Sequence, residues 1–384
     1  MKSRHSRVIA ALGVATLSGM LLSSCSTGAE PAANVELQGV AEEILPMPTM
    51  DDTDGLVLSD EKIADAALLA SAREDQLTWY TGSGQESAEL TAARFEAETG
   101  VSIEMTRLPS SKLAERVLSE AGAGRLGAGV VTLTDPLIAE QFVAEGIFSP
   151  YEVHNYDALA DMGPVVWDQG TYYTAYYSAY AFAYNSELVT GDDIPTTWSD
   201  LLDEKWTDKI GIVSAGAGGT VQGLAHFQEN NFGDQYWADL AALKPRIFDT
   251  TSPQLEALAR GEISVATAGF NSTYGAQMAG SPVTLVVPED GISGTFNMQG
   301  LTTEGADSPA AQLFMNWTMG KSGQEFAAAQ GFVGARTDIE QAATGPYELP
   351  SSDDATFELY TPEDAEIYGA DTVMRWNVAF GYGG

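Results

Sequence analysis

The chain has 384 residues, with 54 acidic and 18 basic side chains and a formal net charge of −36 at pH 7. This balance argues against nucleic acid as a partner, because binding to phosphate backbones needs clustered Lys and Arg. With 44% hydrophobic residues, the chain can still bury ordinary cores. Its length allows two domains or one large one.

Residue types that commonly carry chemistry are scarce. The single cysteine, Cys25, excludes an intramolecular disulfide and a cysteine-based metal cluster. His5, His154 and His226 are not spaced like metal ligands. Neither a Gly-x-Ser-x-Gly nor a His-Glu-x-x-His motif occurs. We therefore expect neither an enzyme nor a bound cofactor, although so many carboxylates leave a secreted hydrolase as an alternative.

The N-terminus has the pattern of an export signal. Basic residues precede an apolar run, Val8–Leu22, that ends at Leu22-Ser23-Ser24-Cys25. This resembles a bacterial lipoprotein signal, in which the chain is cut before the cysteine and lipid is attached to its sulfur. The alternative is a short uncleaved anchor, but the run is shorter than the roughly 20 residues that a spanning helix needs. We expect residues 1–24 to be the signal peptide and Cys25 to be lipidated, which places the protein outside the cytoplasm on the cell membrane.

An acidic segment follows the signal. From Ser26 to Asp60 the chain has acidic residues and prolines but neither Lys nor Arg. Such a composition favours an extended chain, because it buries too little apolar surface to offset the entropy of ordering. We expect residues 25–58 to form an acidic tether. With residues 1–24 removed, the net charge becomes −39, because that segment holds three basic residues and no acidic one.

Strand and helix signals then alternate in an α/β pattern. Ser59 is expected to cap a helix that continues through Ala72. After it we expect strands and helices to alternate: strand Leu77–Thr81, helix Glu86–Thr99, strand Val101–Met105, helix Ser111–Ala121 and strand Gly129–Thr134. A further helix is expected from Asp135, with Pro136 in its first turn. Strands separated by helices of this length predict parallel pairing.

The same pattern returns after an aromatic run, Thr171–Asn185. The expected helices are Thr197–Trp206, 218–229, 232–243, Ser252–Gly261, Ser308–Met319 and Ser322–Gln330, and the expected strands are Ile210–Val213, Arg246–Thr250, Ile263–Ala268, Val283–Val287 and Thr295–Thr303. Beyond Arg336 no basic residue occurs before Arg375, and Trp376, Val378 and Phe380 are expected to dock the terminus on the body. Two such units predict two lobes with a ligand cleft at the strand ends.

The order of several segments resembles ABC-importer solute-binding proteins of the ferric-iron-binding type. The segments are Leu77–Gly84, Phe95–Ile103, Ser111–Arg116, Ala144–Tyr151, Pro195–Asp203, Gly261–Glu262 and Ser322–Gly331. The resemblance spans roughly residues 60–340 and implies a class II-like periplasmic-binding-protein fold, with crossover strands near 171–185 and 290–303. On this basis we assign residues 59–178 plus about 290–340 to the first lobe, 179–289 to the second lobe, and 341–384 to an acidic segment docked on the body.

The small polar residues at expected strand ends are candidate ligands for an anion. Hydroxyls, and backbone N–H groups that small residues leave accessible, can bind phosphate at helix starts. The candidates are Ser83, Gly84, Thr134, Ser214, Gly218, Gly219 and Thr220. The stretch Gly216–Gly219 can equally be a tight turn without a ligand, and it lacks the Gly-Lys-Ser/Thr ending of a nucleotide loop.

Tyrosines raise two further questions. In a strand, Tyr172, Tyr176, Tyr180 and Tyr184 share one face, which is typical of core or hinge packing. Alternatively Tyr176 or Ser178 lines the cleft. Iron-binding members of the resembled family use adjacent tyrosines, whereas the matching region Gly269–Gly275 offers only Tyr274. No metal site is assigned, and Tyr274 is the ligand if iron is bound.

These observations predict a monomeric solute-binding lipoprotein that serves an ABC permease and its ATPase. The expected solute is a small organic anion that bears phosphate or phosphonate and is captured by lobe closure. The alternatives are ferric iron or an iron chelate as ligand, and a solute sensor or a secreted hydrolase as function.

Overall fold

The computed structural model describes residues 30–340, 347, 349–352, 354 and 356–383, so the signal peptide and Cys25 lie outside the described residues. Most strands belong to one sheet of 12 strands with the path β10-β9-β11-β8-β13-β6-β4-β5, and β1–β3 form a small separate sheet. The strands are β1 (Met50–Asp51), β2 (Leu56–Leu58), β3 (Glu61–Ala64), β4 (Gln76–Thr81), β5 (Ser102–Arg107), β6 (Val130–Leu133), β7 (Val166–Trp167), β8 (Tyr172–Asn185), β9 (Ile210–Val213), β10 (Arg246–Phe248), β11 (Val265–Gly269), β12 (Val283–Val286), β13 (Ile292–Leu301), β14 (Val333–Gly334) and β15 (Phe357–Tyr360).

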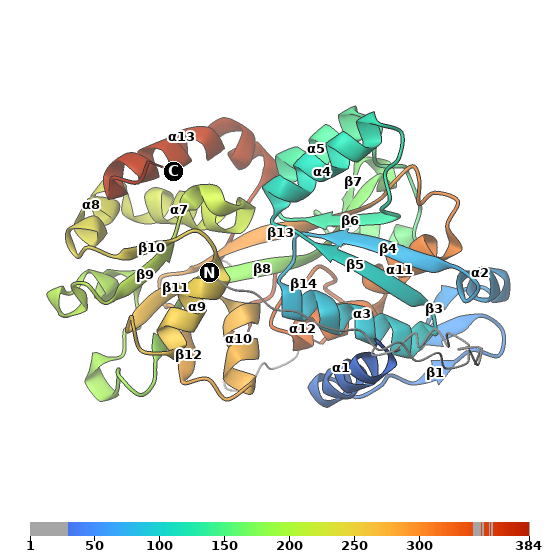
Figure 1. Cartoon of the computed structure of the whole chain (residues 1–384), viewed down its shortest axis with the longest axis horizontal. Helices are drawn as coiled ribbons and strands as arrows, with labels where there is room; N and C mark the ends of the chain where they lie inside the picture. The colour runs from blue at the N-terminus through green and yellow to red at the C-terminus, as the bar shows by residue number, and fades with distance from the viewer. Residues whose placement is uncertain (1–29, 341–346, 348, 353, 355, 384) are drawn as a thin grey trace, which may run out of the picture.

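Helices surround this sheet (Figure 1). The α-helices are α1 (Glu30–Ile44), α2 (Ala66–Ala72), α3 (Gln85–Thr99), α4 (Ser110–Gly122), α5 (Pro136–Ala144), α6 (Tyr156–Ala160), α7 (Gly219–Phe232), α8 (Asp234–Ala242), α9 (Thr251–Ala259), α10 (Phe270–Met278), α11 (Pro309–Met319), α12 (Lys321–Ala329) and α13 (Pro362–Phe380). Short 3₁₀ helices are η1 (Asp168–Gly170), η2 (Gly191–Asp193), η3 (Trp198–Leu202), η4 (Glu204–Trp206) and η5 (Ala215–Ala217).

Two long antiparallel strands, β8 and β13, connect the two halves of the sheet. Tyr173–Tyr180 of β8 pair with Ser293–Gln299 of β13. On its other edge, β8 pairs with β11 in one half of the sheet, and on its other edge β13 pairs with β6 in the other half. Strands β9, β10 and β11 are parallel to one another, as are β4, β5 and β6. The protein therefore has the predicted two-lobed α/β fold, with both crossover strands at the expected positions (Figure 1).

The N-terminal region differs from the sequence expectation. The segment predicted to be an extended tether contains helix α1, which packs on α3, and the strands β1 and β2. The Arg94 guanidinium holds the end of α1 in place, because its Nη1 and Nη2 donate to the carbonyl oxygens of Leu45 and Pro46. The sequence argument weighed only the composition of residues 25–58, whereas these contacts come from a distant helix.

Ser59 does not cap a helix as predicted. Ser59 and Asp60 have φ of 49° and 61° and form the two-residue turn between β2 and β3. Positive φ at both central residues matches the twist of a tight hairpin, so these polar residues close a hairpin instead. The helix begins later, at α2, where the Asp65 carboxylate accepts from the Leu68 N–H at 2.7 Å.

The C-terminal helix α13 packs against α7 and α8, and its N-terminal part reaches α5 (Figure 1). Trp376 is buried, and the Arg375 guanidinium is paired with the Glu229 carboxylate of α7. Phe380 is partly buried against the core, whereas Val378 is 78% exposed. The expectation for Val378 was therefore wrong, because this position lies on the outer face of α13.

Candidate functional site

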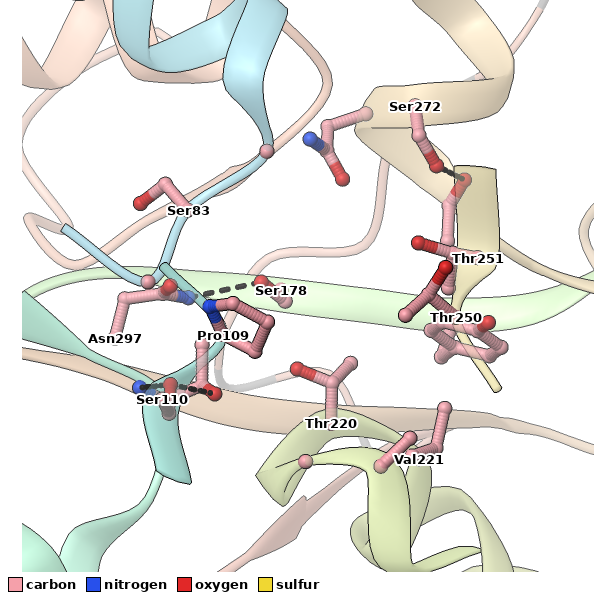
Figure 2. Close-up of a pocket in the computed structure, with 18 of the residues that line it drawn as sticks. Ser83, Pro109, Ser110, Ser178, Thr220, Val221, Thr250, Thr251, Ser272 and Asn297 are labelled. Atoms are coloured by element: carbon pink, nitrogen blue, oxygen red, sulfur yellow. Dashed lines mark hydrogen bonds between the residues drawn. The ribbon is translucent and has the colours of Figure 1, made fainter. Parts of the chain in front are cut away.

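A cavity of about 160 Å³ lies between the two halves, where six strands end. Its lining comes from the segments that follow β4, β5 and β6 on one side and β9, β10 and β11 on the other. Ser178 of β8 and Asn297 of β13 line the cavity between these two groups (Figure 2). Ligands of open α/β sheets bind beyond the carboxyl ends of the strands, and here both halves present such ends to one space.

Several helices that lack a side-chain cap at the N-terminus begin at this cavity. Helices α3, α4, α7, α9 and α10 all begin at lining residues, and at none of them does the N-cap side chain accept a hydrogen bond from the first turn. The first N–H groups of a helix carry partial positive charge, so these N-termini favour an anion in the cavity.

Arg107 supplies the charge of the site. It is the one ionisable Arg, Lys, Asp, Glu or His among the described lining residues, so the cavity has a cation and no carboxylate. Its Nε donates to the Ser83 carbonyl oxygen at 2.9 Å, which holds the half-buried guanidinium at the end of β5. Burial lowers the pKa of Arg107 because it disfavours the charged form, and none of the ion pairs of the described residues involves this side chain.

Hydroxyl and amide groups are arranged in pairs around the cavity. Ser110 Oγ lies 3.0 Å from Thr134 Oγ1 and accepts from the Thr134 N–H at 3.2 Å. The Asn297 amide donates to Ser178 Oγ at 2.8 Å, as Figure 2 shows. These bonds fix the positions of the lining groups, and the hydroxyl lone pairs and protons that they leave unused can meet a polar solute.

Six of the predicted site residues line the cavity: Ser83, Gly84, Thr134, Ser178, Gly218 and Thr220. They come from both halves of the sheet and from a crossover strand. The fold thus brings together residues that are far apart in the sequence, since Ser83 and Thr220 are separated by 137 positions. Their role as solute ligands stays a prediction.

The other four predicted residues lie outside the lining. Tyr176 is not a lining residue but contacts two of them: its hydroxyl lies 2.6 Å from Ser83 Oγ, and its ring centroid lies 4.1 Å from that of Phe332. Burial raises the pKa of Tyr176 to about 12. Ser214 faces a separate hollow beside Tyr382. Gly219 packs against the Thr134 carbonyl, and Tyr274 is placed on α10 away from the cavity.

Sequence reasoning missed several lining residues, chiefly Arg107, Tyr180, Asn271 and Asn297. Arg107 had a usable signal, because it is a basic residue at the end of a predicted parallel strand in a chain that is poor in basic residues. Tyr180 was on the correct face of its strand, but alternation does not tell which point along the strand meets the cavity. The asparagines carried no signal.

Neither a cluster of carboxylate, imidazole and thiol groups suited to a metal ion nor a helix suited to span a bilayer occurs in the described part of the chain. Among those residues, no group of three or more His, Cys, Asp or Glu side chains is placed to hold a metal ion. None of the described helices combines the length and apolarity needed to span a bilayer.

The fold and the cavity define a class of protein: two-lobed binding proteins that hold a small solute in the cleft between the lobes. The family model described as "Bacterial extracellular solute-binding protein" matches residues 91–354. The chain therefore belongs to the bacterial extracellular solute-binding proteins, whose members act outside the cytoplasm.

Individual relatives are distant. An uncharacterized protein of Haemophilus influenzae is 26% identical over 212 residues, which is 52% of this chain and 61% of that protein. Among solved structures, the periplasmic binding protein AfuA of Actinobacillus pleuropneumoniae, with fructose-6-phosphate bound, has 20% identity and a TM-score of 0.65 over 80% of this chain and 99% of its own. Iron-bound HitA of Pseudomonas aeruginosa has 19% identity and a TM-score of 0.62 over 79% and 99%. These likenesses concern the fold.

Proposed function

We propose that this protein is the solute-binding component of an ABC importer and that its solute is a small organic anion bearing phosphate or phosphonate. One observation carries the choice of an anion: in a chain with a net charge of −36, the described cavity lining has an arginine and no carboxylate. The uncapped helix N-termini support the same choice.

The overall acidity does not oppose anion binding in the cavity. Charges at the surface are screened beyond about 8 Å at physiological ionic strength, whereas the partly buried Arg107 guanidinium and the helix N-termini act at contact distance. Serine and threonine hydroxyls at the rim can hydrogen-bond either to phosphate oxygens or to a hydroxylated solute body.

Lobe closure is the proposed mode of capture. The cavity is lined from both halves, so a solute can contact both halves only when they are closed around it. Such a solute binds the closed arrangement more tightly than an open one, and this difference in binding free energy shifts the protein toward the closed arrangement. The crossover strands β8 and β13 are the connections about which the halves would move.

A thermal-shift panel with calorimetry tests the proposed ligand class. Fructose 6-phosphate and methylphosphonate are compared with fructose, thiamine and spermidine. A ligand at about 100 times its Kd stabilises the folded protein by roughly 2.7 kcal/mol, so a true ligand raises the melting temperature. We expect a shift with at least one of the two anions and none with fructose. A shift with only neutral or cationic compounds would refute the proposal.

Iron is the competing ligand, tested with ferric citrate in the same panel. Ferric ion prefers several anionic oxygen ligands, whereas Tyr274 lies outside the cavity lining and no carboxylate is among the described lining residues. We expect no tyrosinate absorption band on addition of ferric salts. A band that Tyr274→Phe abolished would establish iron as the ligand.

The anchor and the partners complete the proposal. Cleavage before Cys25 and lipid on its sulfur would hold a monomeric protein at the outer side of the cell membrane, beside its permease and ATPase. Mass spectrometry of the mature protein tests the lipid, and Cys25→Ser should release the protein from membranes. Uptake of the solute that required the neighbouring permease genes would separate an importer from a sensor, and an absence of turnover would separate it from a hydrolase.

A further inference from the structure

The two halves of the protein are in contact at one end of the cavity, on the side of Thr220 in Figure 2. Gly219 begins α7 in one half, and Thr134 follows β6 in the other. A β-carbon on Gly219 would lie 2.2 Å from the main-chain oxygen of Thr134, so the two backbones touch. The halves therefore have no room to move closer together at this end.

The halves are also in contact at the opposite end, on the side of Ser272 in Figure 2. There α10 of one half meets α3 of the other and the turn after α12, a helix that packs on α3. A β-carbon on Gly275 of α10 would lie 3.5 Å from the Glu86 carboxylate of α3, and one on Gly331 would lie 3.1 Å from Asn271 Cα. With both ends packed, the halves are closed around the cavity.

The volume of the closed cavity limits the size of the solute. The cavity measures about 160 Å³. A protein cavity of about 150 Å³ accommodates benzene, and a water molecule occupies roughly 30 Å³ in the liquid. On either scale the space holds roughly five or six non-hydrogen atoms. A phosphate group has about five such atoms, so it fills most of the cavity by itself.

We propose that the solute is a phosphate or phosphonate compound with an organic body of only about one or two carbon atoms, and that the closed cavity excludes sugar phosphates. This inference rests on the proposed function, in which Arg107 and the helix N-termini hold the anionic group. A larger body has to project out of the cavity or hold the halves apart. In either case the solute loses contacts with one half, so it favours closure less and binds more weakly.

Calorimetric titration with phosphate monoesters of increasing size tests this limit. Methyl phosphate, glycerol 3-phosphate and fructose 6-phosphate carry the same charged group, so at about pH 8 all three are dianions and differ only in the organic body. We expect methyl phosphate to bind most tightly and each larger ester to bind at least about 10-fold more weakly, since one surplus methylene in a fitted pocket already costs about 10-fold to 200-fold. Methylphosphonate, whose body is equally small, should also bind more tightly than the two larger esters.

Val221→Ala widens the cavity and tests whether its wall sets the limit. Val221 lies in the first turn of α7, lines the cavity and is buried (Figure 2). Loss of its two methyl groups should bring the affinity for glycerol 3-phosphate about 10-fold closer to that for the small anion that the wild type binds best. Val283→Ala is the matched control, because Val283 is a buried valine of β12 outside the lining. It should leave the ratio of the two affinities unchanged.

Failure of the size limit is distinguishable from failure of the proposed function. If the wild type binds neither the three esters nor methylphosphonate, the proposed function falls and the size limit falls with it. If glycerol 3-phosphate or fructose 6-phosphate binds as tightly as the small anions, or more tightly, the proposed function stands and the size limit is wrong. An unchanged ratio of affinities in Val221→Ala would also overturn the inference, because the cavity wall would then not be what excludes the larger body.

Discussion

Gly219 and Thr134 meet across the two halves of the protein. A β-carbon on Gly219, at the start of α7, would lie 2.2 Å from the main-chain oxygen of Thr134, which follows β6. Only a residue without a side chain permits this approach of backbone to backbone. We predict that Gly219→Ala forces the halves apart at this point and weakens binding of the solute about fivefold to 150-fold, since overpacking costs about 1–3 kcal/mol.

Calorimetry gives the affinity, and small-angle X-ray scattering shows whether ligand still compacts the variant. Gly122→Ala is the control, because Gly122 is also helical but a β-carbon there would meet nothing within 4 Å. This control should bind normally and be slightly more stable. Normal binding and compaction by Gly219→Ala would mean that the contact is absent from the ligand-bound state.

Arg107→Gln should weaken binding of fructose 6-phosphate or methylphosphonate about 10- to 150-fold. The expected loss corresponds to the 1.5–3 kcal/mol of a hydrogen bond to a charged group, and calorimetric titration measures it. The affinity of the wild type should also fall with added salt more steeply than that of the variant, because a charge contact is lost.

The matched control is Arg125→Gln, which removes an exposed arginine from outside the cavity lining. It changes the net charge of the protein by the same amount. If both variants lost affinity equally, general electrostatics rather than contact with Arg107 would account for the binding, and the assignment of the cavity cation would be wrong.

The ion pair of Arg336 and Asp338 predicts that the folded protein loses stability at acidic pH. Arg336, which is 2% exposed, donates from Nε and Nη2 to the Asp338 carboxylate, and its Nη1 lies 2.8 Å from Glu61 Oε1. These bonds hold the pKa of Asp338 below its usual 3.8. The unfolded chain therefore takes up a proton first as the pH falls, so this stabilisation is complete above about pH 4 and is lost below it.

Urea denaturation of the wild type and Asp338→Asn at pH 7, 5 and 3 measures this effect. The wild type should be the more stable at pH 7 and 5, and the difference should shrink at pH 3. Asp307→Asn, at an exposed aspartate with no ion pair among the described residues, should leave stability almost unchanged throughout. A pH-independent difference for Asp338→Asn would contradict the role of its ionisation.

The buried pair of Arg94 and Glu98 should matter far more for stability than an exposed pair. Arg94 also binds the carbonyls of Leu45 and Pro46, and the Glu98 carboxylate accepts from Trp317 Nε1 at 2.7 Å. Arg94→Met leaves Glu98 buried without its cation, and we expect a loss of about 3–5 kcal/mol in urea denaturation. Lys112→Met, which breaks an exposed pair with Glu115, should cost less than about 1 kcal/mol. Equal losses would contradict this view of the N-terminal packing.

Much of the fold was predictable because it depends on local patterns. The strand Leu77–Thr81, the helix stopped by Gly100 and the long strand within Thr171–Asn185 occur where periodicity and capping residues indicated. The predicted helix Thr197–Trp206 is two 3₁₀ turns instead, and α10 was not predicted. The segment before Ser59 was misjudged, because its order comes from contacts with Arg94 and α3 rather than from its own composition.

The sequence by itself determined the alternating α/β order, the acidic composition and the small polar residues at strand ends, because all of these follow from neighbouring residues along the chain. Only the tertiary structure decided which of them share a cavity. It placed Arg107 and Tyr180 in the lining and left Tyr176 and Tyr274 outside, because sheet pairing and helix packing set where two distant strand ends meet. No periodicity along the chain encodes that meeting point.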